Sequence, residues 1–439
     1  MNLKSYIALK DDIRGIFSIG EIGGLSKTDV MLWCHDINRN HVHEGLLFSS
    51  ITDSLNDRFA KMGLSTITIA RPYSGIPEEE CYGVVRRVNG IIARAILLDY
   101  CIKLIKKIFK AQDTRFNVNF QVMAWERILK KINPKFIIGI EPIKELCIAA
   151  KNNNIVTFDV QHGVQIDSTG EFPGHFYRME YRELKQTGWP DFVVCWDKDS
   201  TDLLKKFRGE FTTPLTLGHP WALRFLSPNQ IKDPIIKSAS RAHELESDLP
   251  VILYSLQYSR DANGNTDSFV PIPKELDTFI KREGKSFTWW LRVHPQLLRD
   301  EFRKNTFEKL AQLYSCYNNV NWLEVSYAPL PYVLSKTSLH FSRDSSVVKE
   351  ASYFGVKSGL FDEEPMRKRL KSLYSNLIQR GDVEVIEDYQ HIREFINRES
   401  SEIKYTNNDE LIIGYENTLK NILQLAHQDM PDVLSNRQQ

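Results

Sequence analysis

The stretch KFIIGIEPIKELCIAAKNNNIVTFDVQHG, residues 135–163, decides the fold. Its first apolar run has the length of a buried strand, its middle has the apolar spacing of a helix, and its last part is a second strand rich in β-branched residues. A strand, a helix and a strand in this order are typical of a parallel sheet that is covered on both faces. The same alternation recurs along most of the chain and predicts an α/β protein. Residues 45–63 likewise predict an amphipathic helix.

The length of the chain and one polar interruption predict two domains. A chain of 439 residues can form two domains, each with its own core. Residues 227–248 are polar and irregular in composition, and an apolar run restarts at Pro250. Two parallel α/β units of this kind imply a cleft between them, where ligands commonly bind. We expect an N-terminal Rossmann-like domain at 1–226, a linker at 227–249, a C-terminal Rossmann-like domain at 250–407, a helix at 408–428 that packs back on the first domain, and a tail at 429–439.

The composition is that of a soluble globular protein, with 42% apolar and 26% charged residues. The 57 Lys and Arg residues balance the 56 Asp and Glu residues, so no net field favours a nucleic-acid partner. The six cysteines are scattered, without the spacing of a metal site or a disulfide framework. This pattern indicates reduced cysteines in a cytoplasmic protein.

One basic segment bears on membrane contact. No run of about 18 apolar residues is present to span a bilayer, so a membrane-linked substrate would be met from the surface. The segment KLIKKIFK, residues 103–110, carries four lysines among apolar residues at helical spacing. It fits either a charged helix face in water or a basic amphipathic face that docks on anionic lipid. In the second case the protein would contact the inner face of the cytoplasmic membrane.

Two polar turns in the second half indicate a phosphate site. The segment LRVHPQ, residues 291–296, and the segment beginning FSRDSS at Phe341 each read as a strand that runs into a polar turn. The second turn opens into a helix, whose N-terminus offers free backbone N–H groups. Ser345 and Ser346 can cap this helix and donate hydroxyls, while His294 can donate to a phosphate oxygen. If the two strands are neighbours, both turns lie on one edge of the sheet.

Three further residues belong to this predicted nucleotide site. Pro295 biases His294 toward extended geometry, which directs its ring away from the strand end. Arg292 adds positive charge, and Glu350, one turn into the helix, can accept hydrogen bonds from ribose hydroxyls. Each residue also has an ordinary structural explanation: a strand-ending turn for the histidine, a simple cap for the serines and a solvated helix face for the glutamate.

The first half carries the candidates for catalysis. Gln161, His162 and Gly163 form a turn after a strand, and Gly163 permits a backbone conformation closed to other residues. We expect His162 to hydrogen-bond a sugar hydroxyl, a phosphate or an attacking group. Glu141 directly follows an apolar strand, where a carboxylate needs a partner or a task. The carboxylates of Glu141 and Asp167 are candidates for a general base or a nucleophile, and the sequence leaves these roles open.

The segment after this turn is expected to form a mobile loop that contacts the acceptor. It is rich in glycine and contains a proline. Its candidate residues are Glu171, His175 and Tyr177. Gln161 and Gly163 of the preceding turn are further candidates for acceptor contact. A dinucleotide-binding fingerprint, a Walker loop and an HExxH motif are all absent, so we expect no cofactor and no catalytic metal.

These motifs together resemble a known family. A strand followed by QHG in the first half, then a strand followed by HP and a strand followed by a Ser-Ser helix, is similar to bacterial GT-B glycosyltransferases of surface-polysaccharide assembly. The closest similarity is to the enzymes that use CMP-activated sugars, the sialyltransferases and Kdo transferases. The resemblance implies two Rossmann-like domains with parallel sheets facing across a cleft. It also implies that His294, Ser345 and Ser346 bind the nucleotide phosphate.

The sequence departs from that family at its catalytic acids. The sialyltransferases carry an acidic pair followed by glycine in the first domain. Here Glu141 is followed by proline, and Asp159 is separated from Gly163 by three residues. The resemblance therefore supports the phosphate-binding residues more directly than it supports a catalytic base.

The function expected from the sequence is a metal-independent glycosyltransferase. It would move a sugar from a nucleotide donor, with CMP-sugars favoured, to a growing capsule, O-antigen or lipopolysaccharide glycan or to a lipid-linked glycan. Two alternatives use the same architecture, namely a polyol-phosphate transferase and a nucleotide-sugar epimerase. A third is a catalytically silent partner in polysaccharide assembly. Donor base, acceptor and stereochemistry stay open.

Overall fold

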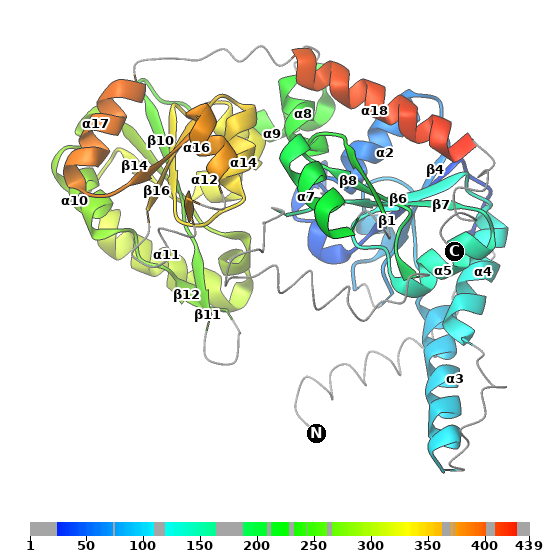
Figure 1. The fold of residues 1–439 in the computed structure, drawn as a ribbon. Coiled ribbons are helices and arrows are strands. Elements are labelled where there is room, and N and C mark those ends of the chain that lie inside the picture. The colour runs from blue at the N-terminus through cyan, green and yellow to red at the C-terminus, as the bar shows by residue number, and fades with distance from the viewer. Residues whose placement is uncertain are drawn as a thin grey trace. The chain divides into compact units, whose positions relative to one another are not determined.

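The structure is a computed structural model that describes residues 24–72, 75–108, 119–163, 188–208, 212–227, 232–243, 245–260, 266–361, 370–371, 374–400 and 409–427. These residues divide into two compact units (Figure 1). Unit 1 contains the described residues between 24 and 163, those between 188 and 220, and residues 413–427. Unit 2 contains the described residues between 221 and 412.

Unit 1 is built on a seven-stranded sheet in the order β5-β4-β1-β6-β7-β8-β9. Every pair of neighbouring strands is parallel. Their carboxyl ends therefore point to one edge of the sheet. The strands are β1 (Val30–Cys34), β4 (Thr66–Ala70), β5 (Val85–Arg86), β6 (Phe136–Gly139), β7 (Val156–Val160), β8 (Phe192–Cys195) and β9 (Thr213–Thr216).

Helices cover both faces of this sheet. On one face, Trp33 of β1 packs edge-to-face on Trp125 of α4 (Phe120–Ile132), within a cluster that also includes α3 (Asn89–Ile108) and α5 (Lys144–Asn152). On the other face, Phe59 of α2 (Thr52–Lys61) packs on Phe136, with ring centroids 5.5 Å apart. Adjacent strand residues face opposite sides, so strands covered on both faces have to be apolar throughout.

The last described helix, α18 (Asp409–His427), packs in unit 1 from Ile413 onward. Glu416 forms an ion pair with Arg58 of α2, and the Thr418 hydroxyl donates to the Thr216 carbonyl of β9 at 2.8 Å. Leu419 is fully buried. The C-terminal helix thus completes the side of unit 1 that α2 occupies. Before β9, α7 (Lys198–Arg208) follows β8.

The helix expected over residues 45–63 is shorter, because a hairpin precedes it. Strands β2 (His41–His43) and β3 (Leu46–Phe48) pair antiparallel. Between them Glu44 and Gly45 both have positive φ, 50° and 82°. Two successive positive φ angles are the geometry of a tight two-residue hairpin turn, which glycine adopts at little cost. The helix α2 begins only at Thr52.

Unit 2 contains a six-stranded parallel sheet in the order β14-β13-β10-β15-β16-β17. A hairpin of β11 (Tyr258–Arg260) and β12 (Thr266–Phe269) follows its first strand. The sheet strands are β10 (Val251–Ser255), β13 (Thr288–Arg292), β14 (Val320–Asn321), β15 (Leu339–Ser342), β16 (Lys357–Phe361) and β17 (Val383–Ile386).

The unit 2 sheet is also covered on both faces, as its cores show. The helices on one face are α10 (Lys274–Arg282), α11 (Asp300–Tyr314) and α17 (Tyr389–Glu399). Those on the other are α12 (Glu324–Tyr327), α13 (Leu330–Leu334), α14 (Val347–Tyr353) and α16 (Ser375–Arg380). The expected α/β fold with two Rossmann-like units is thereby confirmed.

The segment 227–249, expected as a linker, contains a helix. This helix, α9 (Pro234–Ala242), follows α8 (Pro220–Leu226). Asp233 accepts from the Ile235 N–H at 2.9 Å, which caps the helix, and Pro234 fits its first turn. The Asp233 carboxylate also holds the Arg224 guanidinium through two bonds of 2.9 and 3.0 Å. The polar residues that suggested a linker thus serve as a cap and a buried ion pair.

Candidate functional site

The two polar turns of unit 2 lie on the same sheet edge but are not neighbours. Strand β10 runs between β13, which leads to His294, and β15, which leads to Ser345. The Ser342 hydroxyl at the end of β15 donates to the Ser255 carbonyl at the end of β10, at 3.2 Å. Three strand ends therefore form this edge, where the sequence indicated two. The order of strands depends on pairing between distant segments, which the local pattern did not reveal.

His294 is held as a neutral hydrogen-bond donor. Its Nδ1 accepts from the Gln296 N–H at 3.1 Å, and its ring lies 4.6 Å from the Tyr258 ring. Burial, and secondarily the Arg292 charge, lower the pKa of His294 to about 4. Near neutral pH the single ring proton must then reside on Nε2, because Nδ1 is an acceptor. Pro295 occupies the first position of the short helix η8 (Pro295–Leu298) and fixes the turn.

The serine turn is held by a tyrosine. The Tyr374 hydroxyl lies 2.9 Å from the Ser345 carbonyl and 3.2 Å from the Asp344 carboxylate. The Ser345 hydroxyl accepts from the Val347 N–H at 3.3 Å, while Ser346 is the N-cap residue and makes no side-chain capping bond. The helix α14 has only seven residues. The N–H groups of Val347, Val348 and Lys349 are bonded within the turn, so the serine hydroxyls are the donors that it presents.

Arg292 and Glu350 sit deeper than a surface phosphate contact requires. The Arg292 guanidinium donates to the carbonyls of Val325 and Ala328, the latter at 2.7 Å, and so caps the end of α12. Glu350 is 8% exposed. Burial raises the pKa of Glu350 to about 7, and the Arg292 charge opposes this effect. The two residues form an electrostatically coupled layer beneath the turns.

In unit 1, Glu141 and His162 are brought together. Glu141 follows β6 and His162 follows the neighbouring strand β7. The His162 Nε2 lies 3.5 Å from the Glu141 carboxylate, and the two side chains are 39% and 38% exposed. A histidine beside a carboxylate that orients it is the usual arrangement of a general base.

The backbone of Glu141 is left-handed. Its φ is 50°, a conformation that costs a non-glycine residue free energy. Its N–H donates to Asp159 Oδ1 at 2.8 Å, and Asp159 is 8% exposed. Asp159, which the sequence did not place at the site, therefore holds the turn that presents the Glu141 carboxylate.

The other two residues of the QHG turn differ from expectation. Gln161 is 2% exposed, and its side chain accepts from the Trp196 N–H at 2.8 Å and donates to the Gly163 carbonyl at 2.7 Å. It fastens β7 to β8 and does not face an acceptor. Gly163 does not adopt a positive φ, and a Cβ there would meet nothing within 4 Å. At this edge of the unit 1 sheet the residue with a left-handed backbone is Glu141.

Four further candidates lie outside the described residues, namely Asp167, Glu171, His175 and Tyr177. The basic segment 103–110 lies outside the side chains that the structure describes, apart from Leu104.

Sequence reasoning missed His35 and Arg71. They follow β1 and β4, next to the strands that lead to Glu141 and His162. Both are polar residues that directly follow an apolar run of strand length. His35 ends the segment DVMLWCH, and no proline or glycine directly follows it to mark a turn.

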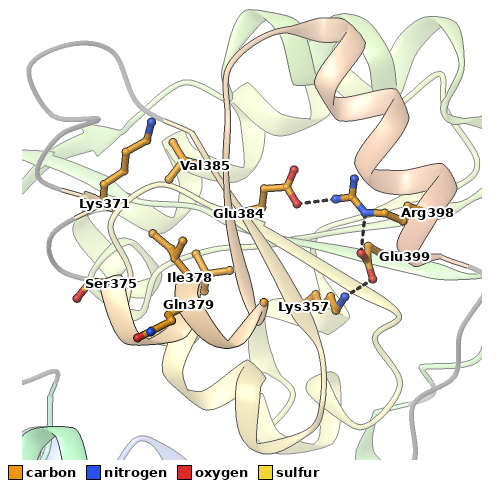
Figure 2. A pocket seen from close by; sticks show the side chains of 11 residues that line it. Lys357, Lys371, Ser375, Ile378, Gln379, Glu384, Val385, Arg398 and Glu399 are labelled. Atoms are coloured by element: carbon orange, nitrogen blue, oxygen red, sulfur yellow. Dashed lines mark hydrogen bonds and ion pairs between the residues drawn. The ribbon is translucent and has the colours of Figure 1, made fainter.

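A pocket of about 610 Å³ lies along the outer strand β17 of unit 2 (Figure 2). Four of its charged residues are paired with one another: Lys357 with Glu399 at 2.6 Å, and Arg398 with Glu399 at 2.8 Å and with Glu384 at 2.5 Å. Lys371, which also lines it, lies 3.8 Å from Glu387. None of the predicted site residues lines it. We interpret it as an ion-pair network at a sheet edge.

Among the residues that the structure describes, no group of three or more His, Cys, Asp or Glu side chains is arranged to hold a metal ion. None of the described helices is long and apolar enough to cross a membrane.

Solved structures resemble the whole chain in fold. A variant of the wall teichoic acid polymerase TagF matches with a TM-score of 0.54 and 12% identity, over 97% of this chain and 95% of that chain. The same variant after a 15-minute soak with CDP-glycerol gives the same values. UDP-GlcNAc 2-epimerase from Neisseria meningitidis, bound to UDP-GlcNAc, matches with a TM-score of 0.53 and 12% identity, over 90% of this chain and 100% of that chain. The chain therefore has a GT-B fold.

No protein-family model and no curated protein sequence matches this chain. Structural similarity at 12% identity establishes the architecture and leaves the reaction to the site residues.

Proposed function

We propose that the protein is a glycosyltransferase of surface-polymer biosynthesis. The nucleotide-activated donor binds at the carboxyl edge of the unit 2 sheet, and the acceptor binds at the carboxyl edge of the unit 1 sheet. The observation that carries this proposal is the state of His294, a neutral ring whose Nε2 proton can donate at the same sheet edge as the Ser345 turn.

The donor edge suits a departing phosphate. When the bond between the sugar and the phosphate oxygen breaks, negative charge accumulates on the phosphate. The His294 Nε2–H and the serine hydroxyls are donors held before the reaction begins, so they stabilise this charge without reorganisation. The Tyr374 hydroxyl holds the serine turn through the Ser345 carbonyl, and the Gln296 N–H holds the His294 ring through Nδ1, so these donors stay in place.

The acceptor edge supplies the proton acceptor. The acceptor hydroxyl oxygen forms the new bond to the anomeric carbon, and its proton passes to the pair formed by His162 and Glu141. His162 takes the proton in this proposal, and Glu141 stabilises the imidazolium that results. Because both side chains are partly exposed, the proton can leave to solvent after each turnover.

A second candidate is polyol-phosphate transfer. It is favoured by the likeness to TagF, whose solved structures include a soak with CDP-glycerol. In that reaction the acceptor hydroxyl attacks phosphorus instead of carbon, and a nucleoside monophosphate leaves. The same donors and the same base serve both reactions, so product analysis separates them: a new glycosidic bond supports sugar transfer, and a new phosphodiester supports polyol-phosphate transfer.

The first experiment is a thermal-shift screen with CMP, CDP, UDP and GDP. Binding at [L] of about 100 Kd stabilises a folded protein by about 2.7 kcal/mol, which moves the melting temperature measurably. We propose a cytidine nucleotide as the preferred donor base. A shift with UDP alone, followed by conversion of a UDP-sugar without acceptor, would instead indicate an epimerase. No shift with any nucleotide would support a silent assembly partner.

We also propose a peripheral membrane contact through α3, which Figure 1 draws as a long helix extending from the sheet of unit 1. Its outer face exposes four apolar residues, and α4 adds Met123. They are Leu97, Leu98, Tyr100 and Leu104, between 43% and 63% exposed. Apolar side chains of this kind bury themselves at a lipid interface. Replacement of Leu97 and Leu98 by serine should reduce sedimentation with anionic liposomes; unchanged sedimentation would remove the proposal.

A further inference from the structure

Three neighbouring strands of unit 1 end in chemically active side chains. Strand β1 lies between β4 and β6, with Cys34 paired to Ala70 and Trp33 paired to Gly139. His35 and Arg71 therefore emerge side by side, and Glu141 emerges on the other side of His35 within two residues of its own strand. The proposed reaction uses Glu141 with His162 but assigns no task to His35 or Arg71.

His35 is fixed as a hydrogen-bond donor. Its Nδ1 accepts from the Ile37 N–H at 3.0 Å, so in the neutral ring the proton resides on Nε2. Burial lowers the pKa of His35, and the Arg71 charge lowers it further, while Asp36 and Glu141 act in the opposite direction. The ring is thus near a permanent cation and keeps one donor available at neutral pH.

Arg71 is anchored at the same edge. Its backbone N–H donates to the Cys34 carbonyl at 2.8 Å, which ties the residue to the end of β1. Two carboxylates lie at the same edge: Asp36 accepts from the Ile76 N–H at 2.9 Å, and Glu141 pairs with His162. A guanidinium next to a neutral imidazole donor is an arrangement that recognises phosphate oxygens.

We propose that Arg71 and His35 form an anion-binding subsite for a phosphate group of the acceptor, directly beside the pair of Glu141 and His162. This inference rests on the proposed function and deepens it, because it specifies a phosphate-bearing acceptor such as a sugar or polyol phosphate polymer. The phosphate would hold the chain while a neighbouring hydroxyl reaches His162. The subsite is separate from the donor edge, which lies in unit 2.

The test uses the full chain and glycerol 3-phosphate as the probe. Calorimetry measures its Kd, and the ring signals of ¹³C-labelled histidines report where it binds, with His35→Gln used to assign the His35 signal. Loss of a charged hydrogen-bond partner should weaken binding about 10-fold or more in Arg71→Ala. Arg71→Gln, which keeps most of the side-chain volume, should show the same loss if the alanine variant folds poorly.

The control is Arg127→Ala, because Arg127 is an exposed arginine on α4 outside the site. It should bind the probe as the wild type does. An unchanged Kd in both Arg71 variants, a His35 signal that does not move on saturation, or no saturable binding would overturn the inference. Inorganic phosphate that competes equally well would reduce the subsite to a simple anion site without polyol recognition, and so contradict the acceptor assignment.

CMP binding separates this inference from the proposed function. If CMP binds with equal affinity in the wild type and in Arg71→Ala while glycerol 3-phosphate binding is lost, the subsite stands apart from the donor edge. If CMP does not bind, or binds independently of His294, the proposed function fails. The glycerol 3-phosphate measurement then still decides whether the subsite exists.

Discussion

The carboxyl edges of the two parallel sheets differ in how they hold their titratable groups. In unit 2, Glu350 is 8% exposed, His294 is neutral, and the Arg292 charge acts on both. In unit 1, Glu141 and His162 are each more than one third exposed, and the strain is in the backbone of Glu141. The unit 2 edge thus resembles a rigid receptor for a fixed charge, while the unit 1 edge can exchange protons with water.

This difference assigns different tasks to two similar structures. Donors that must stabilise a departing phosphate work best when they are preorganised and shielded from water. A base that must shed a proton in every turnover benefits from access to solvent. The fold alone, which repeats in both units, does not contain this distinction.

The largest effect should come from the base. His162→Ala should reduce kcat about 10²- to 10⁴-fold, because His162 is the group that takes the acceptor proton in the proposed mechanism. The affinity for the nucleotide should stay unchanged, since His162 belongs to the other edge. The assay is product formation with the nucleotide donor found in the screen. Turnover close to that of the wild type would remove His162 from the mechanism.

A second experiment tests the buried edge through pH. Glu350 has a folded pKa raised from 4.5 to about 7, so the stability it contributes is present below pH 4.5 and is lost as the pH rises toward 7. His294 has a folded pKa lowered from 6.5 to about 4, so its contribution is present above pH 6.5 and is lost as the pH falls toward 4. Between these limits the two effects oppose each other.

The variants should separate the two slopes. Relative to the wild type, Glu350→Gln should gain stability as the pH rises from 4.5 to 6.5, and His294→Gln should lose it, each by up to about 3 kcal/mol. The free energy of unfolding from urea titrations at several pH values measures both. Parallel curves for all three proteins would show that the two groups titrate normally, and the contrast between the edges would then disappear.

A third experiment tests donor binding. His294→Ala should weaken CMP or CDP binding about 10- to 100-fold, because a hydrogen bond to a charged phosphate is lost. The matched control is His391→Ala, which removes a histidine that contacts Glu384 in the ion-pair network of the same unit. Calorimetry should show wild-type affinity for the control. Equal nucleotide affinity in His294→Ala and the wild type would contradict the donor site.

The smallest effect should come from the strained backbone of the exposed edge. Glu141→Asn should stabilise the protein by about 0.5–1 kcal/mol, because asparagine tolerates the left-handed conformation better than glutamate does. It should also lower activity. Glu44→Asn is the control, since Glu44 has the same φ of 50° in a hairpin turn away from the site. It should raise the melting temperature and keep full activity; a less stable Glu141→Asn would argue against stored strain.

Most of the architecture was predictable, because parallel strands covered on both faces are apolar runs of a recognisable length. The QHG, HP and Ser-Ser turns were identifiable from the same runs, since each follows one. The hairpin ahead of α2 was not, because its turn consists of Glu44 and Gly45 and its strands have only three residues each. The helix α9 was missed because its polar flanks resemble a linker.

The site was predictable only where a local motif marked it. The position of β10 between β13 and β15 depends on long-range pairing, so the third strand end at Ser255 went unnoticed. The role of Asp159 depends on a hydrogen bond to a residue 18 positions away. His35 carries no motif and Arg71 only a following proline, so their proximity becomes visible only when β1 and β4 are known to lie side by side.

The position of α18 has a consequence for biosynthesis. Residues 413–427 belong to unit 1, and the Thr418 hydroxyl donates to the Thr216 carbonyl of β9, 202 positions earlier in the chain. A ribosome releases these residues after every described residue of unit 2. Synthesis of unit 1 therefore begins before that of unit 2 and ends after it, and the α2 side of unit 1 stays uncovered while unit 2 is being made. We therefore expect a nascent chain of this protein to need a chaperone more than a chain with two contiguous domains would.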